Sequence, residues 1–288
     1  MNRNSRRATW MGAVLGALIA FLAFALQARA SAWEGAETEE FHQTYPLSAN
    51  GHIELDNING PVSIKVWDRD DVKVDAIKRA NSKRDLQEVE IRIKSEKSYL
   101  SIRTHYPEHN HNFVRNDPAS VEYSLMVPRS ARLSDINLVN GNLDIEGSNG
   151  EVRAACVNGR LSAHNLGGRA ELSTVNGNLE ASFDRLAAPV EVSSVNASVL
   201  LTLPSDAKAD IEANTISGAI SNDFGITVAS HRWVGHELNA ELGGGGTRVR
   251  VSNVNGRIEI RHANDNRPLS PAKGFDHDRG DKDDDDTI

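Results

Sequence analysis

Cysteine is almost absent from the chain: Cys156 is its single cysteine among 288 residues. One cysteine excludes an intramolecular disulfide framework. Its position in the middle of the chain also excludes the lipid-modified cysteine that begins a mature lipoprotein. A reactive thiol would need cationic neighbours that the sequence does not identify, so we expect Cys156 to be a small structural residue on a strand.

Aromatic residues and cations are also scarce. Phe, Trp and Tyr make up 5% of the chain, so aliphatic side chains must fill the core. Residues 1–30 contain four Arg and no acid; without them the 32 basic residues fall to 28 and face 40 acidic ones, a net charge of −12. Phosphate binding needs clustered cations, and nucleic acid is therefore not an expected partner.

Signatures of common enzymes are missing as well. The chain has no G-x-S-x-G elbow, no H-E-x-x-H pair and no phosphate-binding Gly-Lys loop. Outward carboxylates such as Asp144, Glu171 and Glu180 could serve a glycosidase, which needs two of them about 5–9 Å apart. Polar alternation on a solvated strand face predicts the same residues. We therefore expect no enzymatic activity and no cofactor, and an enzyme acting on polysaccharide is a distant alternative.

A nine-residue repeat runs through the middle of the chain. Two apolar positions, two residues apart, recur at this interval: Leu143, Val152, Leu161, Ala170 and Leu179, and Ile145, Ala154, Ala163, Leu172 and Ala181. Residues two apart share one face of a strand, so both rows should point inward. A third apolar residue follows, as at Val139, Val157, Leu166 and Val175, just before a turn. Such a period predicts stacked repeats, because one strand and turn cannot bury its apolar face alone.

The turns are Asn-Gly dipeptides, which tolerate positive φ and bend the chain at little steric cost. The similarity is strongest at eighteen residues, in the corners Asn140-Gly141, Asn158-Gly159 and Asn176-Gly177. We therefore predict an all-β, repetitive β-solenoid of the β-helix or β-roll kind, with two strands per coil. The Asn side chains should stack along one corner and satisfy each other's amides. A chain of antiparallel hairpins is the alternative, since Asn-Gly is also a hairpin signal.

Copies of the template at Asn59-Gly60 and Asn255-Gly256 bracket the folded region. Residues 72–127 alternate as strands without Asn-Gly corners and should cap or flank the solenoid. We assign 50–262 to one solenoid domain, 31–49 to a linker and 263–288 to a disordered acidic tail. The tail is assigned because it is hydrophilic and has no apolar period.

The N-terminus combines three Arg at positions 3, 6 and 7, an apolar run, and Ala28-Arg29-Ala30. A charged segment, an apolar segment and an A-x-A site make up a secretory signal peptide over residues 1–30. We therefore expect cleavage after Ala30 and export to the periplasm or cell envelope, or secretion. The alternative is an uncleaved inner-membrane anchor, since residues 8–27 approach the length of about 20 that spans a bilayer.

Two groups of histidines are weak candidates for sites. His105, His109 and His111 could converge on Zn²⁺ or Cu²⁺ in a loop, although a polar loop is the simpler interpretation. A second group, in an insertion ahead of Gly243, could line a ligand site or pack an aromatic ring over the open end of the solenoid. Its members are His231, Trp233 and His236.

The Asn-Gly-bounded strands of 139–181, the passage 216–224 and the glycine run 243–246 leading to Asn255-Gly256 resemble the bacterial "putative adhesin" β-strand-repeat family. The resemblance covers roughly residues 50–262. It implies an exported envelope protein, and it offers no catalytic residue to carry over, because fold does not fix function.

Together these features predict a non-enzymatic binding or scaffolding module of the bacterial cell envelope, with an envelope protein or a glycan as partner. Outward residues are expected to form one mixed-charge face: Asp144, Arg153, Arg160, His164, Arg169, Glu171 and Glu180. One alternative is a self-assembling structural protein, since strand edges at the solenoid ends could stack. Another is an envelope-stress regulator that signals through a retained N-terminal helix.

Overall fold

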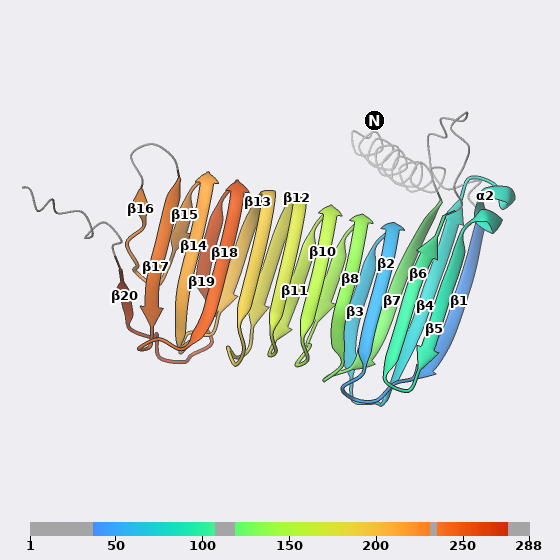
Figure 1. Ribbon diagram of the computed structural model, residues 1–288, viewed down its shortest axis with the longest axis horizontal. Helices are drawn as coiled ribbons and strands as arrows, with labels where there is room; N and C mark the ends of the chain where they lie inside the picture. Colours follow the sequence, from blue (N-terminus) through green and yellow to red (C-terminus); the bar gives the residue numbers. More distant parts are fainter. Residues whose placement is uncertain (1–36, 107–118, 231–234, 276–288) are drawn as a thin grey trace, which may run out of the picture.

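The computed structural model describes residues 37–106, 119–230 and 235–275, and these form one long row of strands (Figure 1). Two walls of strands enclose an aliphatic core, and each central coil gives one strand to each wall. Neighbouring coils pair in parallel with an eighteen-residue register, as in Val152 beside Ala170 and Leu161 beside Leu179. The predicted solenoid with two strands per coil is confirmed, and the hairpin alternative is wrong for these coils.

The first wall contains, in spatial order, β5 (Glu90–Glu96), β6 (Tyr99–His105), β2 (His52–Asn59), β8 (Arg132–Asn140), β10 (Val152–Asn158), the first halves of β12 (Ala170–Phe183) and β13 (Val190–Leu203), β18 (Thr247–Asn255), β14 (Ala209–Ser217) and β17 (His236–Leu242). Two short strands, β16 (Ala229–Ser230) and β20 (Ala272–Gly274), pair with β17.

The second wall contains β1 (Glu37–Pro46), β4 (Asp71–Ala80), β7 (Ser120–Pro128), β3 (Val62–Trp67), β9 (Leu143–Glu146), β11 (Leu161–Leu166), the second halves of β12 and β13, β19 (Ile258–His262) and β15 (Ile220–Asn222). A short helix, α2 (Lys83–Glu88), connects β4 to β5 and buries Leu86. Its first turn is capped by the Ser82 hydroxyl, which accepts a hydrogen bond from the backbone N–H of Asp85.

The core confirms both inward rows of the nine-residue repeat. Leu143, Leu161 and Leu179 stack on one another in the second wall and are fully buried. Ala154 and Leu172 are equally enclosed in the first wall. Because the inward side chains are mainly Val, Leu, Ile and Ala, the two walls can lie close together over a thin core, as the scarcity of aromatic residues indicated.

The Asn-Gly corners form the predicted asparagine ladder. Each side-chain amide donates to the Oδ1 of the Asn one coil before it, with Asn140 to Asn59 at 2.9 Å, Asn158 to Asn140 at 2.9 Å and Asn176 to Asn158 at 3.0 Å. The ladder continues through Asn196 at 3.2 Å to Asn255 at 3.5 Å. It therefore joins six coils, three more than the corners from which it was predicted.

Breaking the ladder should weaken the fold moderately. We expect Asn158→Ala to lower the free energy of unfolding by about 1–2 kcal/mol, because one amide bond is lost on each side of the coil. The control is Asn178→Ala, which removes an exposed Asn of the next coil that makes no ladder bond and should change the free energy of unfolding by less than about 0.5 kcal/mol. Chemical denaturation measures both, and equal effects would contradict a stabilising ladder.

Buried polar side chains support the corners from inside. Cys156 is 1% exposed, and its Sγ lies 3.5 Å from the carbonyl oxygen of Gly141. Burial raises the pKa of this thiol, which keeps it protonated and unreactive. At the same template position, Asn57 donates to the carbonyl of Val121 at 2.9 Å, and Asn253 donates to that of Ala197 at 2.9 Å. The burial of Cys156 and its contact with Gly141 agree with the structural role expected for it.

The coils do not stack in chain order at the ends. β2 and β3 form the first coil in sequence, but β6 and β7 lie outside them. Likewise β18 and β19 lie between β13 and the β14–β15 coil, which precedes them in sequence. The copies at Asn59-Gly60 and Asn255-Gly256 thus do not bracket the fold, which corrects the sequence prediction. Outer coils pair with antiparallel strands on their far side, so they need not follow the template.

Two domain boundaries also need correction. Residues 37–46 of the predicted linker form β1, which pairs antiparallel with β4 and packs Phe41 and Tyr45 against the core. An edge strand needs only one neighbour and can be polar on both faces, so its sequence carries a weak strand signal. Residues 31–36 of that linker and the signal segment 1–30, with Ala28 and Ala30, lie outside the described residues.

The predicted tail is ordered over its first part. Residues 272–274 form β20, and Ser270 donates its backbone N–H to the carbonyl of Ser205 at 2.8 Å. Arg267 binds Asp206 at 2.9 Å. Backbone pairing and an ion pair hold this segment in place. Such contacts leave no apolar period in the sequence, so the sequence pattern does not predict its order. Residues 276–288 lie outside the described residues.

Candidate binding surface

In the first wall, the third apolar position of the template points outward, whereas Leu166, at this position in the second wall, is buried. The first-wall position lies three residues after the second inward position, and an odd spacing places it on the opposite face of the strand. Seven β-branched residues occupy this position, each 36–57% exposed and each beside the next across the strand register: Ile58, Val139, Val157, Val175, Val195, Val254 and Ile216. We call this set the apolar strip. With strands about 4.8 Å apart, six intervals make it about 29 Å long.

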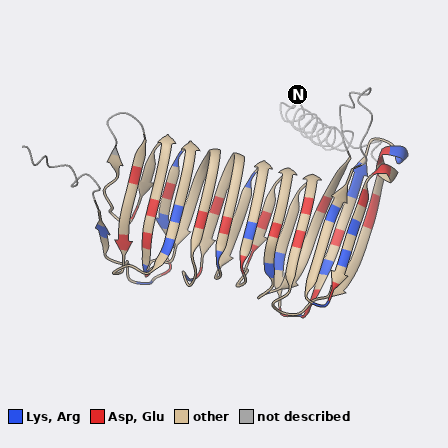
Figure 2. Ribbon diagram, viewed as in Figure 1, with Lys and Arg blue, Asp and Glu red and all other residues tan. Residues whose placement is uncertain are grey.

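Small residues, mostly serines, lie beside the apolar strip. The outward positions two residues earlier are occupied by Ala155, Ser173, Ser193 and Ser252 in the central coils. Charged positions lie mainly over the middle and lower parts of the strands, while the upper ends of β10, β12 and β13 carry none (Figure 2). Over the central coils, the apolar strip and its small neighbours therefore form an exposed surface without charge. At the β2 end, the corresponding position is Asp56, which pairs with Arg103 at 3.2 Å.

Charged residues occupy the outward positions nearer the strand starts. Arg153 binds Glu171 at 3.0 Å, and Arg250 binds Glu212 at 2.9 Å, each across one strand interval. These side chains are 43–51% exposed. The hydrogen bond from Arg250 to Glu212 raises the pKa of that guanidinium and keeps it charged. Exposed pairs of this kind contribute at most about 1 kcal/mol, so they set the charge pattern of the wall more than its stability.

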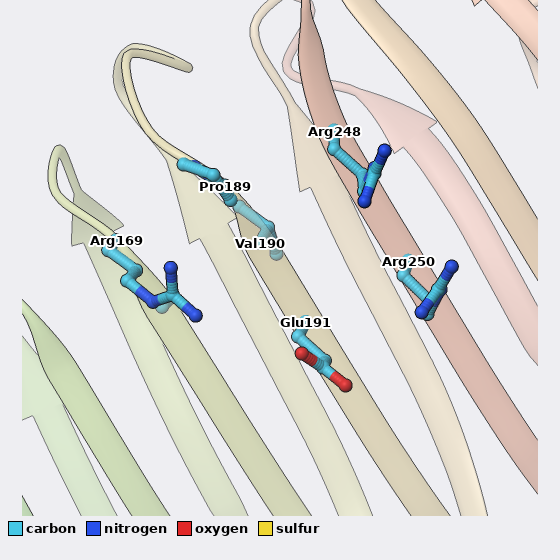
Figure 3. A pocket seen from close by; sticks show the side chains of 7 residues that line it. Arg169, Pro189, Val190, Glu191, Arg248 and Arg250 are labelled. Atoms are coloured by element: carbon cyan, nitrogen blue, oxygen red, sulfur yellow. The ribbon is translucent and has the colours of Figure 1, made fainter.

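A shallow hollow of about 230 Å³ opens among these charges at the starts of β12, β13 and β18. Arg169 lies on one side, Arg248 and Arg250 lie on the other, and Pro189 and Glu191 lie between them (Figure 3). Three guanidinium groups and one carboxylate therefore face a single open depression. We call it the arginine hollow.

The residues predicted to form one mixed-charge face are divided between the two walls. Arg153, Arg169 and Glu171 belong to the first wall. Asp144, His164 and Glu180 lie on strands of the second wall, and Arg160 directly precedes β11 of that wall. The prediction of one face is therefore wrong, because the nine-residue interval carries the chain from one wall to the other and only the eighteen-residue interval returns to the same wall.

The histidine candidates gain no support as sites. His105 ends β6, while His109, His111, His231 and Trp233 lie outside the described residues. His236 begins β17. Among the residues that the structure describes, no group of three or more His, Cys, Asp or Glu side chains is placed to hold a metal ion.

The exposure of the apolar strip and the whole arginine hollow were not predicted from the sequence. The sequence contained a signal for the strip. The third apolar position follows the second inward position by three residues, and an odd spacing along a strand changes the face. The hollow had no such signal, since β18 enters next to β13 only after an excursion of more than forty residues.

Parallel coils, asparagine corners and two flat walls define a β-solenoid repeat protein. Residues 131–261 match the family model described as Toastrack DUF4097. The match agrees with the resemblance seen in the sequence. No curated protein matches the chain.

Solved structures of bacterial proteins show likenesses of low identity. One is a putative cell adhesion protein from Clostridium sporogenes, 13% identical, with a TM-score of 0.46, covering 78% of this chain and 100% of that one. Another is a putative adhesin from Bacteroides fragilis, 9% identical, with a TM-score of 0.26, covering 78% of this chain and 97% of that one. Within the described residues, no helix is long and apolar enough to cross a membrane.

Proposed function

We propose that the chain is a non-enzymatic, adhesin-like binding module of the bacterial cell envelope, and that its apolar strip meets an envelope protein. The single observation that carries the proposal is the alignment of seven exposed β-branched side chains in one uncharged row. Exposure of these apolar side chains to water is unfavourable, so a partner that covers them gains binding free energy from the hydrophobic effect. Export is supported by the signal-peptide pattern of residues 1–30.

The strip is suited to a partner with a straight apolar ridge. Its side chains are stiff at χ1, so little conformational entropy is lost when a partner orders them. The flat row of Ala and Ser beside them lets a partner approach closely.

Removing the methyl groups of the strip should weaken envelope binding. The test variant combines Val157→Thr, Val175→Thr and Val195→Thr, which keep the branched Cβ and the strand preference of valine. We expect the wild-type chain to co-sediment saturably with envelopes of the native host. The triple variant should bind about tenfold more weakly, because a hydroxyl group replaces one methyl group of each of the three valines.

The control for this experiment is Leu200→Thr, a half-buried outward residue of the second wall. It makes the same kind of change on the opposite side of the solenoid and should leave binding unchanged. Equal binding by the wild type and the triple variant would contradict the proposal.

The self-assembly alternative has less support. The edge strands β1 and β5 carry charged side chains, including Glu37, Glu39, Arg92 and Lys94, and charges on an edge oppose pairing with another strand. The regulator alternative depends on a retained N-terminal helix, which lies outside the described residues. Mass spectrometry of the native N-terminus tests it. The polysaccharide-cleaving alternative gains no support from the arginine hollow, because Glu191 is the one carboxylate in its lining.

A further inference from the structure

The arginine hollow exists because Pro189 interrupts a row of long side chains. Arg169 and Arg248 occupy the same position on the strands either side of it, one residue before the paired Ala170, Val190 and Val249. Two strand intervals place the Cα atoms of the two arginines about 10 Å apart. Because the proline ring is short, the space above it stays open, and a guanidinium group lies on each side (Figure 3).

The charges around the hollow are not fully compensated. Glu212 holds Arg250 at 2.9 Å, whereas the ion pair of Arg169 with Glu151 spans 3.9 Å. Among the described residues, neither Arg248 nor Glu191 makes an ion pair within 4.0 Å. Arg248 therefore keeps its five N–H donors for an incoming group, and Glu191 keeps its acceptor oxygens.

We propose that the arginine hollow binds the carboxylate of an acidic sugar residue within a polysaccharide. Arginine binds carboxylates through two parallel hydrogen bonds, and Arg169 and Arg248 approach the space above Pro189 from opposite sides. Glu191 repels a second anionic group but accepts hydrogen bonds from hydroxyls. A uronic acid carries both features, one carboxylate with hydroxyl groups next to it.

The position of the hollow suits a polymer. It lies open on the outer face of the first wall, so a chain of sugars can cross it without an end having to enter. An acidic peptide would offer carboxylates but no hydroxyls to Glu191, which favours the glycan. This inference goes beyond the proposed function, because the hollow and the apolar strip are separate parts of the wall and either can fail alone.

Calorimetric titration of the full chain with tetragalacturonate tests the inference. We expect saturable binding that weakens as salt is added. Arg248→Gln should weaken it about tenfold or more, since a charge-assisted pair is lost. Arg261→Gln is the matched control, because it removes the same charge from the second wall, and it should leave the affinity unchanged.

Several results would overturn the inference. Equal losses in Arg248→Gln and Arg261→Gln would indicate general charge attraction. Equal binding of maltotetraose, which is neutral, would show that the carboxylate is not recognised. Tighter binding of tetraglutamate than of tetragalacturonate by the wild-type chain would identify a peptide site. No binding of tetragalacturonate at millimolar concentration would exclude the site.

Discussion

Replacing Gly159 by alanine should unfold the central coils under conditions where the wild-type chain is stable. The φ angle of Gly159 is +144°, a backbone conformation open almost only to glycine. A Cβ at this position would overlap the carbonyl oxygen of Gly141 in the preceding coil. The nearest atoms that this Cβ would meet all belong to the backbone of Gly141, so no side-chain rotation relieves the clash. We expect a loss of about 4 kcal/mol or more in the free energy of unfolding, measured by chemical denaturation.

A matched control separates the clash from the cost of positive φ. Gly244 also has positive φ, +86°, but a Cβ there would have no atom within 4 Å. Gly244→Ala should therefore cost only about 1–2 kcal/mol. Equal losses in the two variants would mean that the coils are not stacked as closely as the structure shows.

Leu161→Asp should have an effect of similar size for a different reason. Leu161 is fully buried between Leu143 and Leu179 of the neighbouring coils. An aspartate there would place an unpaired charge in an aliphatic core, or would have to be protonated at a large cost. We expect a loss of about 4 kcal/mol or more, again by chemical denaturation.

The control for Leu161→Asp is Glu180→Ala. Glu180 lies one coil away on the outer side of the same wall, directly beside Ser162. Its removal should change the free energy of unfolding by less than about 0.5 kcal/mol. Similar melting of the two variants would contradict the assignment of inward and outward positions.

The central coils could be predicted from the sequence because each element of the repeat has one structural meaning. Paired apolar positions two residues apart predicted Leu143 and Ile145 as core residues, and both are buried. The recurrence of Asn-Gly at eighteen residues predicted the stacked amides of Asn140, Asn158 and Asn176. The repeat period and the turn residues are local signals, so they can be recognised in the sequence without knowledge of long-range contacts.

The ends of the solenoid could not be predicted in this way. Which coil lies beside which is decided by contacts between distant segments, such as β18 beside β13, and no local pattern encodes it. Edge elements such as β1 and β20 form mainly through backbone pairing, which leaves little trace in composition. The arginine hollow depends on the same long-range pairing, because Arg248 meets Pro189 only once β18 has entered the stack.

Thiol labelling of one coil tests the central claim, that the first wall is the binding surface. Ser193→Cys and Thr202→Cys place single reactive thiols on the first and second wall of β13, respectively, while the native Cys156 is buried. The account predicts that envelopes of the native host slow the labelling of Ser193→Cys several-fold and leave Thr202→Cys unchanged. Unchanged labelling at both positions, or slowing at Thr202→Cys alone, would contradict it.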